Sequence, residues 1–449
     1  MNNEELVLFE RFSTGITWNG IFYVVHKLLA TSCTFLFFKM LPTATFSLWI
    51  NSTSIIFLTV LWLDCGLRKT VPRYVQEFIA TKRFTASLIK YYLVLLLLVL
   101  PPWYLVMKPW LTVYAPLAAI LLVCESMGAL LRLIFHSHFW HKQFNSMHAA
   151  VLFATTCAQM SIVMAFNQHN PFLLSALIIS QICGSIAVLC LALGALPALF
   201  RSHVYPLEGN STDDPATRKK LTREIATHAG IMWGTTIGKS ITERNMLVPL
   251  FTTIFGAHHA NIFKVGQDGA LLLQRVVIKT IGTTDTSLLA HAYKKGEETL
   301  IHKVLKKITT KIATLCLPVS GILLVILAKR DLFFSDPTVF HIFYLIVSCY
   351  LIESSLSVYE RVLEVKRAYR AIFAAYVPYV IVMGVCIFFN LFSSIGLIGS
   401  ILVIQGVRLV SLLSMTYWAC VLYNAPFSRV TLLTMLGGVI PLLFYYVMF

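Results

Sequence analysis

The stretch His259–Ala292 reads HANIFKVGQDGALLLQRVVIKTIGTTDTSLLAHA. It is long enough to cross a bilayer as one helix, yet it is charged along its length. At 100° per residue, four of the five Lys, Arg, Asp and Glu side chains in this stretch, all but Asp285, fall within about 60° of one another, on one face. A charge at mid-bilayer costs at least about 2.5 kcal/mol, so this face should meet water or polar partners and line a cavity. The residues that share the face are Lys264, Asp268, Arg275 and Lys279.

The composition predicts a polytopic membrane protein. Of the 449 residues, 57% are hydrophobic and only 12% are charged, and the mean hydropathy is +0.76. The net charge of +16 does not indicate a nucleic-acid partner here, because membrane proteins gather Lys and Arg in cytoplasmic loops. The ten cysteines lie mostly inside apolar runs without a CxxC motif. They predict buried thiols, and we expect no metal site and no cofactor.

The apolar runs predict an all-α fold with about 13 transmembrane helices, within a range of 12 to 14. Each run is near or above the ~20 residues that a helix needs to cross the hydrocarbon core. The predicted spans are 14–38, 44–64, 88–107, 110–133, 147–167, 171–200, 222–255, 259–292, 304–328, 337–362, 371–391, 395–423 and 430–448.

The basic residues orient these spans. Alternate connections hold 25 Lys and Arg on the side of the N-terminus and four on the opposite side. Because cytoplasmic loops are enriched in these residues, the N-terminus is predicted to be cytoplasmic. We expect an integral protein of a bacterial inner (plasma) membrane, in contact with membrane lipids.

The longest polar connection divides the chain. Residues 201–221 hold Pro, Gly, Ser, Asp and a basic run, which is typical of a solvated cytoplasmic linker. It separates an N-terminal six-helix lobe, 1–200, from a C-terminal six-helix lobe, 222–423, and an additional C-terminal helix lies in 424–449. Duplicated halves with a substrate site between them are a common transporter architecture.

Four segments carry a resemblance to a known family. They are LPTATFSLW (Leu41–Trp49), LDCGLRKTVPRYVQEF (Leu63–Phe78), TDTSLLAHAYKKGEE (Thr284–Glu298) and YERVLEVKRAYRAIF (Tyr359–Phe373). Their order resembles the polysaccharide-biosynthesis (Wzx-type) flippases of the multidrug/oligosaccharidyl-lipid/polysaccharide (MOP) exporter superfamily. The resemblance implies a MATE-like fold, in which two six-helix lobes form a V around a central cavity. It also implies alternating access by rocking of the lobes, in a protein that works as a monomer.

The sequence departs from two branches of that superfamily. Multidrug antiporters commonly carry a coupling carboxylate in the first helix or deep in the seventh and tenth, whereas the first span here carries His26 and Lys27 at mid-depth. Lipid II flippases use cavity arginines, which agrees with a cationic cavity, but they have fourteen helices.

Several cations are predicted near the membrane midplane. They suit the pyrophosphate of a polyprenyl-linked sugar, because phosphate oxygens accept several charge-assisted hydrogen bonds. The alternative is that the charges are structural, since Lys239–Glu243 and Lys264–Asp268 are both i,i+4 and could neutralise each other. Lys264 and Arg244 lie nearer the outer face, where snorkelling is the favoured interpretation. The candidate substrate-binding residues are Lys27, Lys239, Arg275, Lys279 and Arg408.

Acidic residues within the spans are candidates for ion coupling. They are Glu353, Asp268 and Glu125, and the coupling ion would be H⁺ or Na⁺. A buried carboxylate can carry a proton, but Glu353 can equally pair with Arg408, and pairing is slightly favoured.

Three functions remain after these observations. The leading one is a flippase that moves a lipid-linked (polyprenyl-pyrophosphate) oligosaccharide or polysaccharide precursor across the membrane. The alternative is an ion-coupled MATE-type drug or metabolite antiporter. A membrane glycosyltransferase or ligase is disfavoured, because the longest outer connection, Ala328–Val339, offers only Asp331 and Asp336. We therefore expect a transporter rather than an enzyme.

Overall fold

A computed structural model describes most of the chain. The described residues are 21, 24–25, 28–68, 70–71, 82–137, 141–166, 170, 172–201, 215–241, 243–274, 289, 298–334 and 336–449.

Every regular element in the described residues is a helix, and none of them forms a strand. Nine helical stretches of this part are long and apolar enough to cross a membrane. Large apolar side chains such as Leu97 (72% exposed) and Leu105 (69%) point outwards, as they do where lipid replaces water. The predicted all-α polytopic membrane fold is confirmed.

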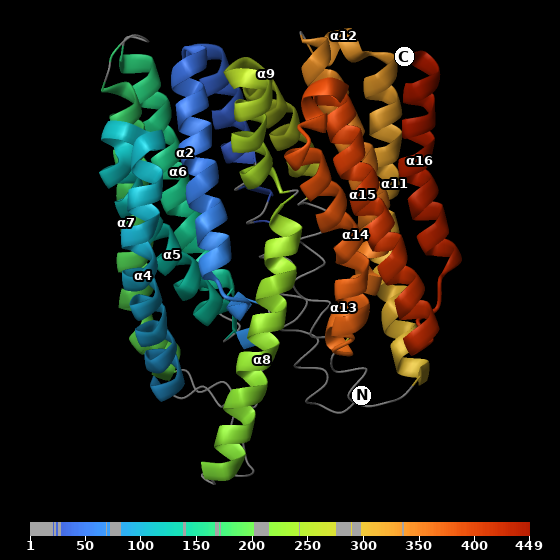
Figure 1. The fold of residues 1–449 in the computed structure, drawn as a ribbon, viewed down its shortest axis with the longest axis horizontal. Helices are drawn as coiled ribbons and strands as arrows, with labels where there is room; N and C mark the ends of the chain where they lie inside the picture. Colours follow the sequence, from blue (N-terminus) through green and yellow to red (C-terminus); the bar gives the residue numbers. More distant parts are fainter. Residues whose placement is uncertain are drawn as a thin grey trace. The chain divides into compact units, whose positions relative to one another are not determined.

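The chain forms two compact units, and the first consists of residues 36–249. Its helices alternate in direction along the sequence (Figure 1). Leucines, isoleucines and aromatic residues of several of these helices form one apolar core, in which Leu122 and Phe135 are fully buried. The helices that lie within this unit are α2 (Thr43–Leu63), α4 (Lys82–Leu111), α5 (Ala115–Ser137), α6 (His141–Ala165), α7 (Leu173–Arg201) and α8 (Pro215–Ser240).

The second unit consists of residues 1–35 and 250–449. It holds the first part of the helical segment Leu28–Met40 and most of α9 (Arg244–Gln274). The remaining helices are α11 (Glu298–Ala328), α12 (Arg330–Phe333), α13 (Pro337–Val365), α14 (Tyr369–Phe388), α15 (Leu391–Tyr423) and α16 (Arg429–Met448).

Helix α13 is the centre of this second unit. It packs against α11, α14, α15 and α16. Of its most apolar 18-residue stretch, 89% is buried, compared with 33% of the corresponding stretches of α14 and α16. The additional C-terminal helix predicted in 424–449 is α16, and it packs on α11 and α13. It is therefore an integral part of this unit.

Local sequence explains where the helices of the second unit begin and turn. Asp336 caps α13 by accepting from the backbone N–H of Thr338 at 2.7 Å, and Pro337 follows in the first helical position. Asn390 and Asn424 adopt left-handed backbone conformations at the turns before and after α15. Asparagine tolerates this conformation better than most residues, so short turns suffice between antiparallel helices.

The predicted seventh and eighth spans, 222–255 and 259–292, differ from the observed helices. Helix α8 ends at Ser240 and α9 begins at Arg244, so the predicted seventh span is not one continuous helix. Helix α9 then continues through a kink at Gly256, where φ is 83°, into the described part of the predicted eighth span. Apolar periodicity does not register a three-residue interruption, which explains the error.

Two predicted boundaries also differ from the structure. Helix α8 starts at Pro215, inside the predicted linker 201–221, because proline suits the first position of a helix. The compact units do not follow the predicted lobes 1–200 and 222–423. Residues 28–35 join the C-terminal unit, since Thr31 and Thr34 hydrogen-bond to Asp268.

Candidate functional site

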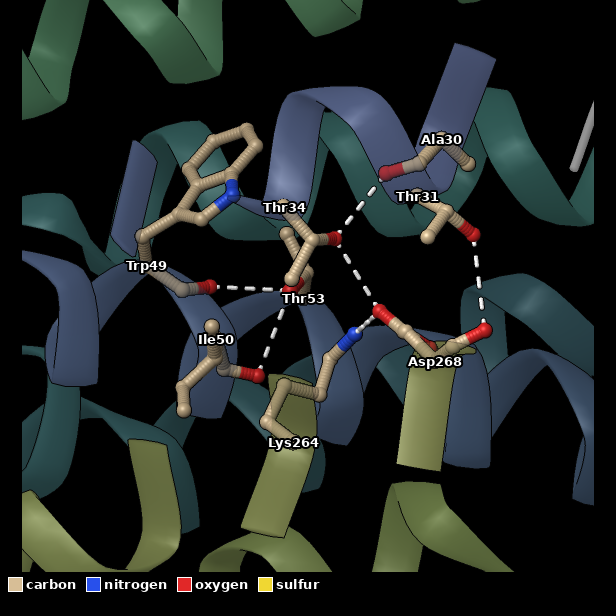
Figure 2. Close-up of polar contacts among 8 residues, drawn as sticks. All are labelled: Ala30, Thr31, Thr34, Trp49, Ile50, Thr53, Lys264 and Asp268. Carbon is tan, nitrogen blue, oxygen red and sulfur yellow. Dashed lines mark hydrogen bonds and ion pairs between the residues drawn. The ribbon is translucent and has the colours of Figure 1, made fainter. Parts of the chain in front are cut away.

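The most deeply buried charges of the described chain are Lys264 and Asp268 on α9. Residues 261–268 are all buried, and Lys264 and Asp268 are only 8% and 3% exposed. The two side chains form an ion pair one helical turn apart (Figure 2). The structure thus shows the i,i+4 pairing that the sequence left open as an alternative, whereas the snorkelling interpretation favoured for Lys264 is wrong.

Glycine allows α9 to bury this polar turn. Gly266 lies against α13, and a Cβ at this position would approach Ile342 Cγ2 to 2.8 Å. The absence of a side chain lets the two helices pack closely, which excludes lipid and water from the flanking residues. At 100° per residue, Gly266 lies on the opposite face of α9 from Lys264 and Asp268, so this contact buries the back of the turn, while Asp268 faces the segment Leu28–Met40.

Two threonines of the segment Leu28–Met40 complete the site. The Thr34 hydroxyl lies 3.0 Å from Asp268 Oδ2, and the Thr31 hydroxyl donates to the Asp268 backbone carbonyl at 3.4 Å (Figure 2). A buried ion pair is tolerated only when further hydrogen bonds satisfy its remaining polar atoms. Thr34 supplies such a bond to the carboxylate, and Thr31 binds the backbone of the same residue. The pair and the two hydroxyls form one polar cluster, which we call the α9 cluster (Thr31, Thr34, Lys264 and Asp268).

A second ion pair lies between α13 and α15. Arg408 Nη2 donates to Glu353 Oε1 at 2.6 Å, and the Arg408 guanidinium also lies over the Tyr350 ring, 5.5 Å from its centroid. The two side chains are 25% and 13% exposed, so this pair is less buried than the α9 cluster. The structure therefore shows the Glu353–Arg408 pairing that the sequence favours.

Glu125 has a different environment, in the unit formed by residues 36–249. Its Oε1 accepts from the Ser185 hydroxyl at 2.8 Å and from Gln181 Nε2 at 3.2 Å, both on α7. Gln159 of α6 donates to Gln181 Oε1 at 3.1 Å and extends the chain of amides. Within the described residues this carboxylate has neutral donors instead of a cation.

Of the other predicted site residues, the structure describes only Lys239. Lys239 is half-buried in the last turn of α8. Because the helix ends at Ser240, Lys239 and Glu243 do not share one helix, and the i,i+4 relation assumed for them is wrong. Lys27, Arg275 and Lys279 lie outside the described residues.

Sequence reasoning missed the neutral partners of the charged residues. Thr31 and Thr34 are one helical turn apart in an apolar segment, and Gln181 and Ser185 repeat this pattern on α7. Polar residues at i,i+3 or i,i+4 inside a span are a signal for buried partners. Which charge they meet depends on tertiary packing, which the pattern does not give.

Comparisons with known proteins agree with this architecture. No family model matches the sequence, and no curated protein matches it. The fold is similar to that of a multidrug resistance MATE family transporter of the MOP superfamily in an outward-facing conformation. The TM-score is 0.61 at 12% identity, over 92% of this chain and 96% of the other.

Two further solved structures are similar. One is a MATE transporter of Vibrio cholerae (TM-score 0.59, 12% identity, 94% of this chain and 100% of the other). The other is a MOP superfamily transporter from Pyrococcus furiosus, whose binding pocket is described as having a reverse polarity that suggests a different function. It gives a TM-score of 0.57 at 14% identity, over 92% of this chain and 96% of the other. The protein is therefore a multi-pass membrane protein with the fold of the MATE transporters of the MOP superfamily.

Proposed function

We propose that the protein is a transporter that flips a polyprenyl-pyrophosphate-linked oligosaccharide or polysaccharide precursor across the membrane by alternating access. The observation that carries this proposal is the charge balance of the spans. The buried acids Asp268 and Glu353 are each neutralised locally, by Lys264 and Arg408. The sequence also places Lys27, Arg275 and Lys279 at mid-depth, and an anionic cargo would match their positive charge.

The cations suit a pyrophosphate group. Lys27, Lys239, Arg275 and Lys279 would bind it, because phosphate oxygens accept charge-assisted hydrogen bonds and arginine can donate two of them at once. Arg408 is engaged by Glu353 in this conformation, so the proposal depends on the other four. The cargo's lipid tail would remain among the membrane lipids while its sugar crosses.

An ion-coupled MATE-type antiporter of drugs or metabolites is the second candidate. Glu125 favours it, because a carboxylate held by a hydroxyl and an amide can bind H⁺ or Na⁺ without displacing a cationic side chain. One of the similar structures is a multidrug transporter, while the Pyrococcus furiosus protein is described as different in pocket polarity. The fold thus accommodates pockets of opposite polarity.

A membrane glycosyltransferase or ligase receives no support from the outer connection. Asp336 serves as the N-cap of α13, and Asp331 lies 3.4 Å from Arg330. Of the two acids in this segment, Asp336 is thus engaged as a helix cap, whereas Asp331 is 93% exposed. We therefore favour transport over catalysis.

The test is lipid flipping by the purified protein in liposomes. The probe is a fluorescent polyprenyl-pyrophosphate-linked N-acetylglucosamine, and dithionite reports how much of it remains in the outer leaflet. Arg275→Ala should slow flipping by about ten- to a hundredfold, because one charge-assisted contact contributes about 1.5–3 kcal/mol. Lys108→Ala removes an exposed cation from the last turn of α4 and should leave flipping unchanged.

The same liposomes distinguish the two candidates. A wild-type protein that leaves the lipid probe unflipped, yet expels ethidium in response to a proton or sodium gradient, would contradict the flippase and support the antiporter. In that case Glu125→Gln should abolish the gradient-driven efflux. Full flipping by Arg275→Ala would contradict the assignment of the phosphate-binding residue alone.

A further inference from the structure

Helix α11 is longer than a membrane crossing requires. Its stretch His302–Ala328 is apolar enough to span a bilayer and rises about 40 Å, whereas the hydrocarbon core is about 30 Å thick. About two turns must therefore lie outside the core. All four lysines of this stretch belong to its first ten residues, which places the beginning of α11 at the level of the lipid headgroups.

One face of α11 is exposed along the whole length of the helix. Lys303 and Lys306 are exposed near its start, and Leu317 (43%) and Val325 (59%) are exposed further along. At 100° per residue, these four side chains fall within about 100° of one another. Exposed leucine and valine on a membrane helix indicate a lipid-facing surface, so the two ammonium groups lie at the edge of that surface.

Helix α16 brings a further cation beside α11. The two helices pack together, and a Cβ at Gly437 would lie 3.1 Å from Leu317 Cδ2. Arg429 precedes Gly437 by about 12 Å along α16, and Lys306 precedes Leu317 by about 17 Å along α11. Because both helices begin at the same end of the unit (Figure 1), Arg429 and Lys306 lie at similar depth.

The outward face of α16 follows the same pattern as that of α11. Arg429 is exposed, and Leu433 (56% exposed) and Leu436 (42%) fall within about 60° of it. Each helix thus presents a basic side chain first and apolar side chains deeper in the membrane. In the part of the chain that the structure describes, Lys303, Lys306 and Arg429 form no ion pair with an acid. An anion from outside the chain can therefore reach them without displacing an internal partner.

We propose that this surface, the α11–α16 face (Lys303, Lys306, Leu317, Arg429 and Leu433), binds an anionic phospholipid such as phosphatidylglycerol. The phosphate accepts charge-assisted hydrogen bonds from the ammonium groups and from the guanidinium, which can donate two at once. The acyl chains of the same molecule lie along the exposed leucines. Charge and apolar surface thus match one ligand, and basic clusters next to a membrane helix attract anionic lipids.

A phospholipid suits this face better than the proposed cargo does. The face lies on the lipid-exposed side of α11 and α16, where phospholipids are the surrounding molecules. Its argument uses neither the identity of the cargo nor the membrane orientation, since both ends of a span lie at a headgroup region. The proposal is therefore independent of the proposed function.

The test is lipid binding to the purified full-length protein in detergent, measured by native mass spectrometry as phosphatidylglycerol is added. Lys303→Gln/Lys306→Gln should weaken binding at least about tenfold, and Arg429→Gln about fivefold, because each cation adds a similar attraction for anionic lipid. Phosphatidylcholine, whose headgroup carries no net charge, should bind weakly to all variants. Added salt should weaken phosphatidylglycerol binding, because the cations are exposed.

The matched control is Lys90→Gln/Arg223→Gln, which removes two exposed cations from the other compact unit and should leave phosphatidylglycerol binding unchanged. An equal loss in this control would show a general effect of net charge and overturn the site. Lys303→Arg/Lys306→Arg keeps both charges and should bind like the wild type. Loss of binding in this variant would overturn the role assigned to charge.

Two further ligands test the choice of a phospholipid. Glycerol phosphate has the headgroup without acyl chains, and binding as tight as that of phosphatidylglycerol would overturn the lipid assignment. Tighter binding of farnesyl pyrophosphate, lost in Lys303→Gln/Lys306→Gln, would assign the face to the cargo and overturn the proposal as well. Phosphatidylglycerol binding is measured without cargo, so its failure would leave the flippase proposal standing.

Discussion

Glu353 and Arg408 neutralise each other between α13 and α15, and this pair shows what a sequence can reveal about single residues. This pair and the Lys264–Asp268 pair join residue types that the sequence places at compatible depth or spacing, so both could be anticipated from it. The threonine partners of Asp268 were not, because they are 234 and 237 residues away along the chain. A hydroxyl in an apolar helix has no charge that would identify its partner.

Glu353→Gln should destabilise the protein by about 3 kcal/mol, because it leaves the Arg408 guanidinium without its carboxylate in a largely buried position. Thermal unfolding in detergent, followed by tryptophan fluorescence, measures the effect. Glu353→Gln/Arg408→Met is the matched control, since it replaces the pair by neutral side chains and should recover most of the loss. An unchanged melting temperature of Glu353→Gln would show that the pair contributes nothing to stability.

At the scale of the elements, the apolar runs predicted that the helices exist, but not where they are interrupted. The predicted and observed ends of α13, α15 and α16 agree within a few residues, because capping residues and short turns mark them. The break after Ser240 was missed because the interruption before α9 is only three residues long, too short to alter the pattern of the surrounding sequence. Close contacts between helices, such as that of Gly66 with α8, were equally invisible in the pattern.

Gly66 follows α2 with φ at +73°, and its Cα faces α8 so closely that a Cβ would overlap the Ala229 carbonyl and lie 2.8 Å from the Trp233 nitrogen. Gly66→Ala should therefore cost at least about 2 kcal/mol, from backbone strain and from forced separation of α2 and α8. The melting temperature in detergent is the measurement. Gly128→Ala is the control, because nothing lies within 4 Å of its Cβ position, and it should be neutral or slightly stabilising. Equal melting temperatures for the two variants would refute the close contact.

For the whole molecule, the sequence was enough to predict the class of fold, but not which segments belong to each compact unit. Hydropathy and charge bias predicted a polytopic all-α chain, which the structure confirms. The grouping of residues 28–35 with 250–449 arises from packing and from the Thr31 and Thr34 hydrogen bonds, and no linker composition announces it. The 25-to-4 bias of Lys and Arg also predicts which ends of the helices face the cytoplasm.

That orientation can be tested at the two ends of the second unit, where α12 and the start of α16 lie at opposite ends (Figure 1). In a cysteine-free background, Leu332→Cys places a thiol at an 80% exposed position on the predicted outer side, and Arg429→Cys places one on the predicted cytoplasmic side. A membrane-impermeant maleimide should label Leu332→Cys in intact cells and Arg429→Cys only after permeabilisation, because the reagent cannot cross the bilayer. The cysteine-free protein controls for background labelling. The reverse pattern would invert the membrane topology that the charge bias predicts.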